Sequence, residues 1–129
     1  MTKLAAVAAA FALVAAACGS DSDGAVDAAP YLRAYAGVCA AGTAVSDGDL
    51  ARARTTFYDQ SHQPIHQLAA AAEAKDRGVA GRLLEAKQVV EAELAGQANP
   101  QIADFDRLAK AMATAIDTVS DSTTEPCSR

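Results

Sequence analysis

Apolar side chains recur at steps of three and four residues in four separate stretches of this 129-residue chain, which strongly constrains its fold. The clearest stretch follows Asn99 and Pro100, a cap residue and a proline suited to the first helical position. Its apolar positions are Ile102, Phe105, Ala109, Met112, Ile116 and Val119. No stretch alternates with period two, and β-branched residues are sparse. We therefore predict an all-α chain.

Turn residues separate the helical stretches, notably Ser46 to Asp49, Asp76 to Gly78, and Gly96. Pro64 lies inside the second stretch and cannot donate to the carbonyl of Gln60, so we expect a kink or break there. The predicted helices cover residues 28–45, 49–75, 79–95 and 100–119. Helices of this length with short connections favour an up-down four-helix bundle. The last two helices, periodic and otherwise plain, are predicted to be scaffold.

The predicted core is aliphatic, because Trp is absent and the chain has only three Tyr and three Phe. The core positions of the first three helices are Leu32, Tyr35, Ala36, Cys39 and Gly42, then Leu50, Ala53, Phe57, Ile65, Leu68 and Ala72, then Val79, Leu83, Ala86, Val90 and Leu94. The third helix also carries charges that we interpret as a solvated face with local ion pairs: Arg82, Glu85, Lys87, Glu91 and Glu93.

The amino-terminal residues have the composition of an export signal. Lys3 precedes fourteen uncharged residues, 4–17, a stretch shorter than the ~20 residues that span a bilayer. Three alanines then lead directly to Cys18, with Val14 just upstream. This arrangement resembles the lipobox of bacterial lipoproteins, and the alanine richness resembles actinobacterial ones. The resemblance implies cleavage before Cys18, with acyl chains such as palmitate on its thiol and on the new amino terminus. Ordinary secretion that leaves Cys18 unmodified is the alternative.

The expected organisation follows from this leader. Residues 1–17 are the signal peptide, residues 18–27 are the lipidated cysteine with a flexible tether, and residues 28–129 are the helical domain. The segment 19–24 is small, polar and acidic, which is typical of a tether. The expected location is extracytoplasmic, anchored to the cell membrane by lipid at Cys18.

Charge limits the partners of the domain. The whole chain carries 11 basic and 16 acidic residues; all acidic residues follow the leader, whereas Lys3 leaves with it. The mature chain would thus carry 10 basic and 16 acidic residues, a net charge of −6. Such a surface repels nucleic acid and anionic headgroups.

Two cysteines, Cys39 and Cys127, remain once Cys18 is assigned to lipidation. Outside the cytoplasm two such thiols commonly form a disulfide. The alternative is a metal site shared with histidine, although the two cysteines form no Cys-x-x-Cys motif.

The chain has two histidines, His62 and His66, and their spacing of four places them on one helix face. Tyr58 extends the same row, and Asp59 lies three residues before His62. Two imidazoles at this spacing can bind Zn²⁺ or Cu²⁺ with a carboxylate, for which Asp59 is the first candidate. Further candidates are Glu73, Glu85 and Glu91. The alternatives are structural histidines or a surface that contacts a partner.

The exported helical bundle with a histidine pair resembles imelysin-like periplasmic proteins. Their His-x-x-Glu motif is missing, because Ile65 and Ala69 occupy the glutamate positions, so no residues carry over. The chain also lacks His-Glu-x-x-His, Cys-x-x-Cys-His and a phosphate-binding glycine loop. We therefore expect no enzyme activity. The expected function is a binding or interaction module for an envelope protein, and the alternative is a Zn or Cu-binding lipoprotein.

Overall fold

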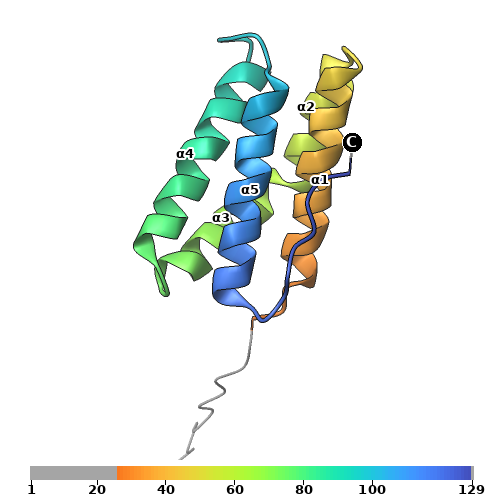
Figure 1. Ribbon diagram of the computed structural model, residues 1–129. Coiled ribbons are helices and arrows are strands. Elements are labelled where there is room, and N and C mark those ends of the chain that lie inside the picture. Colours follow the sequence, from red (N-terminus) through yellow and green to blue (C-terminus); the bar gives the residue numbers. More distant parts are fainter. Residues whose placement is uncertain (1–25, 129) are drawn as a thin grey trace, which may run out of the picture.

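The computed structural model describes residues 26–128, which form five helices and no strand. The helices are α1 (Ala29–Ser46), α2 (Leu50–Gln60), α3 (His62–Glu73), α4 (Arg77–Leu94) and α5 (Ile102–Val119). They lie side by side, and the carboxyl-terminal tail runs back along α1 (Figure 1). The predicted all-α class is confirmed. The predicted signal peptide and Cys18 lipidation, and nearly all of the tether, lie outside the described residues. No helix within residues 26–128 has both the length and the hydropathy to span a bilayer.

The helical segment predicted over residues 49–75, with a kink or break expected at Pro64, is divided at Ser61 into α2 and α3. Ser61 is fully buried, and its Oγ donates a hydrogen bond to the carbonyl of Ala34 in α1 at 2.8 Å. Pro64 is the third residue of α3, a first-turn position at which no intrahelical donor is required. The break that Pro64 suggested is real, but a tertiary hydrogen bond places it at Ser61.

Gly37 of α1 allows this close approach. A Cβ at Gly37 would lie 2.5 Å from Ser61 Oγ and 2.9 Å from Gln60 Cβ. Real Cβ atoms do not approach neighbours this closely, so α1 can meet the junction between α2 and α3 only through a residue without a side chain.

We expect Gly37→Ala to lower the free energy of unfolding by about 1–3 kcal/mol, because the methyl group must displace buried Ser61. Gly81→Ala is the matched control: Gly81 lies in α4 with nothing within 4 Å of its Cβ position. That substitution should stabilise the protein by about 0.5–1 kcal/mol through helix propensity. Urea unfolding measures both. Equal changes at the two positions would contradict the steric account.

Most predicted core residues are buried, including every one assigned to α4. Four predictions are wrong: Leu50, Ile102 and Leu32 are 45%, 39% and 36% exposed, and Ala36 is also exposed. Leu50 and Ile102 are the first residues of their helices, where no preceding turn covers them. In α1 the buried face instead centres on Ala34, Val38 and Ala41, which rotates Leu32 and Ala36 outward.

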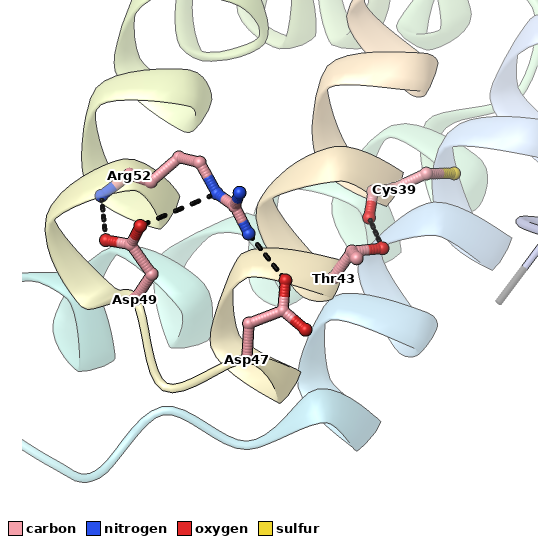
Figure 2. A network of polar contacts seen from close by, with 5 residues as sticks. All are labelled: Cys39, Thr43, Asp47, Asp49 and Arg52. Atoms are coloured by element: carbon pink, nitrogen blue, oxygen red, sulfur yellow. Dashed lines mark hydrogen bonds and ion pairs between the residues drawn. The ribbon is translucent and has the colours of Figure 1, made fainter.

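Acidic side chains hold the connection between α1 and α2, where a turn was predicted (Figure 2). Asp49 Oδ1 accepts from the backbone N–H of Arg52 at 2.9 Å and caps α2. The Arg52 guanidinium reaches back to Asp47 Oδ2 at 2.6 Å. In the last turns of α1, Thr43 Oγ1 donates to the carbonyl of Cys39 at 3.1 Å (Figure 2). These groups are exposed, so each ion pair contributes at most about 1 kcal/mol.

The start of the last helix differs from the prediction, since α5 begins at Ile102 and its cap is Gln101. Asn99 and Pro100 belong to the preceding loop. The reason is buried Glu93, whose Oε2 accepts from the backbone N–H of Gln101 at 3.2 Å and holds that residue extended. Burial and neighbouring Asp104 raise the pKa of Glu93, opposed by the Gln101 N–H.

A disulfide joins Cys39, in the middle of α1, to Cys127 in the tail, which confirms the predicted pairing. The two Cα atoms lie 5.5 Å apart although the residues are 88 positions apart in sequence. The tail that follows α5, residues 120–128, therefore links the end of α5 covalently to the middle of α1 (Figure 1).

Candidate functional site

The structure brings the two histidines together at the start of α3. The ring centroids of His62 and His66 lie 5.1 Å apart, with the planes nearly perpendicular at 80°. The ring of Tyr58 in α2 lies 5.4 Å from that of His62. The predicted row of Tyr58, His62 and His66 therefore survives the helix break.

Helix α4 completes this polar cluster with a carboxylate and an ammonium group. Glu91 Oε1 accepts from Lys87 Nζ at 2.6 Å and lies 2.8 Å from His62 Nε2. The Lys87 side chain is only 3% exposed, and Glu93 is also buried. The solvated face predicted for α4 is therefore wrong at Lys87 and Glu93, because α3 and the loop before α5 cover them.

The cluster disfavours protonation of His66. Desolvation lowers the pKa of His66, and the nearby positive charges of Lys87 and His62 lower it further, while Glu91 opposes them. The unfolded chain therefore binds a proton at His66 at a higher pH than the folded chain does. The contribution of neutral His66 to the free energy of unfolding is therefore fully present above the ordinary histidine pKa of 6.5, and it decreases as the pH drops below that value.

We accordingly expect His66→Gln to flatten the stability profile on the acid side. Wild-type protein should lose more unfolding free energy between about pH 7 and 5 than the variant does, because only wild type pays for protonating His66 beside Lys87. Urea unfolding across this pH range measures the difference. A variant as pH-sensitive as wild type would contradict this assignment.

The carboxylates proposed to join the histidines are arranged differently from the prediction. Asp59 is exposed near the end of α2, and Glu73 pairs with Arg77 at 3.8 Å. Within residues 26–128, no three His, Cys, Asp or Glu side chains are grouped so that they could hold a metal ion. Glu91, the carboxylate that does reach His62, already contacts the Lys87 ammonium.

A second feature, which the sequence analysis did not predict, is a groove between α4 and α5 with a volume of about 390 Å³. We call it the α4/α5 groove. Its apolar lining comes from Val79, Ala86, Val89 and Ala111, and its polar lining from Arg82, Glu85, Arg107, Lys110 and Thr114. The groove thus combines apolar surface with three cations and one carboxylate.

The cations of the groove stand at its surface. Arg82 and Lys110 are exposed, and the Arg107 side chain is 64% exposed while its Nη1 donates to Asp104 Oδ1 at 2.7 Å. This positive rim belongs to a chain whose net charge is −5. Cations outnumber carboxylates three to one among the charged lining residues, which favours an anionic partner at this place.

One sequence signal for the groove was available. Val89 directly precedes the core residue Val90, so it cannot share the buried face of α4. Val89 lies beside the core face, and Arg82, seven positions or two turns earlier, lies on the same side of the helix. Together they indicated a second contact surface on α4. The opposing residues of α5 could not be assigned, because periodicity does not say which helices are neighbours.

Comparison with protein-family models, with curated proteins and with solved structures gives no match for this chain.

Proposed function

We propose that this protein is a cell-envelope lipoprotein that acts as a non-enzymatic binding module for another envelope protein. In this proposal acyl chains on Cys18 anchor the protein, residues 18–27 act as a tether, and the helical domain presents the α4/α5 groove. We further infer that α2 and α3 together take the place of one long helix in an up-down four-helix bundle.

The observation that carries the binding role is the α4/α5 groove. Its volume of about 390 Å³ lies within the range of about 300–1,000 Å³ that is typical of ligand sites. Its lining is apolar at Ala86, Val89 and Ala111, where a partner can bury surface. The charged side chains around it can then fix orientation and specificity.

The location is supported by two independent features. The apolar leader ends in three alanines and Cys18, a pattern that directs lipidation in bacterial lipoproteins. The Cys39–Cys127 disulfide is the kind of bond that persists in oxidising compartments outside the cytoplasm.

Site-specific photocrosslinking in intact cells tests the binding role. A photoreactive amino acid at Val89 in the groove should give one discrete protein adduct in the envelope fraction. The same amino acid at Ala36, on the exposed side of α1, is the control and should not give it. Loss of the Val89 adduct on Arg82→Glu/Lys110→Glu would tie it to the groove. An envelope-located protein that gives no adduct at Val89 would contradict the proposal.

The alternative function, binding of Zn²⁺ or Cu²⁺, rests on the 5.1 Å separation of the His62 and His66 rings. It predicts a melting temperature that rises with metal concentration, and loss of that rise in His62→Ala/His66→Ala. The binding-module proposal predicts no rise at micromolar Zn²⁺, because the Lys87 ammonium already contacts the nearest carboxylate, Glu91. The same melting experiment therefore separates the two functions.

A further inference from the structure

We infer that the α4/α5 groove binds an acidic amphipathic helix of the partner protein. This inference rests on the proposed function and specifies the chemistry of its partner. It follows from the length of the groove, its small apolar side chains and the sign of its charges.

The groove has the dimensions of a helix-binding surface. Its lining extends over residues 79–89 of α4 and 107–114 of α5, two helices that lie side by side (Figure 1). At 1.5 Å rise per residue this is about 10–15 Å, or roughly two to three helical turns. A third helix laid along it would contact both α4 and α5.

The apolar lining suits close packing of a helix. Ala86 of α4 and Ala111 of α5 are small, so they leave room for an approaching helix at the usual axis separation of about 8–10 Å. Val79 and Val89 lie toward the two ends of the α4 side. Apolar side chains of the partner, at spacings of three and four, would fill the space between them.

The charges select an acidic partner. Arg82, Arg107 and Lys110 line the groove together with one carboxylate, Glu85. Arg107 is already paired with Asp104, so exposed Arg82 and Lys110 are the main cations for a partner. Arginine can hold a carboxylate with two parallel hydrogen bonds, which a flexible lysine does less specifically. Asp or Glu residues flanking the apolar face of the partner helix would meet these cations on both sides of the groove.

An anionic lipid fits less well than a helix. On the same two helices, Leu83, Leu108 and Met112 are fully buried in the packed core, so an acyl chain would have to bind at the surface of the groove. Such a chain would lie in the open groove with one side in water. An amphipathic helix covers the same apolar surface and presents its own polar face to solvent.

Peptide binding tests the inference on the full exported chain carrying Cys18→Ser, which removes the proposed acylation site. The probe is a fluorescent helical peptide of about five turns, with Leu and Ala on one face and Glu on both flanks. A matched peptide has Lys in place of every Glu. We expect anisotropy to detect the acidic peptide and not the basic one, with affinity that falls as salt rises.

Arg82→Glu/Lys110→Glu should weaken binding of the acidic peptide by about tenfold or more, since two favourable contacts become repulsive. The control, Arg33→Glu/Lys75→Glu, makes the same change of net charge at exposed residues outside the groove and should alter the affinity by less than about twofold. Equal losses in both variants, or equal binding of both peptides, would overturn the inference.

Two further outcomes also overturn the inference. If sedimentation shows a dimer that is lost in Arg82→Glu/Lys110→Glu, the groove binds a second copy of the chain. If phosphatidylglycerol vesicles bind wild type but not that variant, the groove binds lipid. The proposed function fails separately. A Val89 adduct in cells without acidic-peptide binding removes only the inferred partner chemistry, whereas absence of that adduct removes the binding role itself.

Discussion

Replacing Cys39 and Cys127 together by alanine should lower the free energy of unfolding by about 4 kcal/mol. The disulfide closes a loop of 88 positions, and cross-linking so long a loop restricts the unfolded chain strongly. Domains of this size have stabilities of about 5–15 kcal/mol, so the bond supplies a large fraction of the total.

The measurement is urea unfolding of wild type with and without reductant, beside the double variant. Reduced wild type and Cys39→Ala/Cys127→Ala should unfold at nearly the same urea concentration, well below oxidised wild type. Tyr35→Phe is the control. It removes a hydroxyl that lies 3.8 Å from Cys127 Sγ but leaves the disulfide intact, so reductant should still lower its unfolding midpoint. If reduction left the urea midpoint of wild type unchanged, the Cys39–Cys127 disulfide would not contribute to stability.

Glu91→Ala should lower the free energy of unfolding by about 2–3 kcal/mol. The substitution removes the carboxylate that lies 2.6 Å from the Lys87 ammonium, whose side chain is 3% exposed. An unpaired buried charge costs about 3–5 kcal/mol in the protein interior, and access of water through the partly exposed Glu91 position reduces that cost here.

The double variant Lys87→Met/Glu91→Leu provides the decisive comparison. It removes both charges and retains the apolar stem, so its stability should return to within about 1 kcal/mol of wild type. Chemical unfolding of the single and double variants gives the coupling between the residues. A double variant as unstable as Glu91→Ala would mean that lost packing, and not the unpaired ammonium, causes the effect.

Local sequence signals predicted most of the fold. The turn that ends at Asp49 was correctly placed at the start of α2, since a side-chain cap needs only residues nearby in sequence, whereas the cap formed by Asp76 was missed: α4 begins at Arg77 and not at the predicted residue 79. A kink or break was expected from Pro64, but its position at Ser61 could not be predicted, because serine is compatible with a helix. The break depends on the Ala34 carbonyl and on the space left by Gly37, both on another helix.

The candidate sites were predictable only in part. The spacing of His62 and His66 predicted their proximity, and Glu91 was among the carboxylates considered as neighbours. The burial of Lys87 was missed because a Lys and a Glu four residues apart are typical of a surface face. The groove was missed because it exists only where α4 lies beside α5.

The most direct test of the central claim, an envelope lipoprotein that carries a helical binding module, is mass spectrometry of the native protein recovered from membranes. The claim predicts a chain that begins at Cys18, with acyl chains on its thiol and its amino group. A product that retains Met1, or that has an unmodified thiol at residue 18, would contradict the claim.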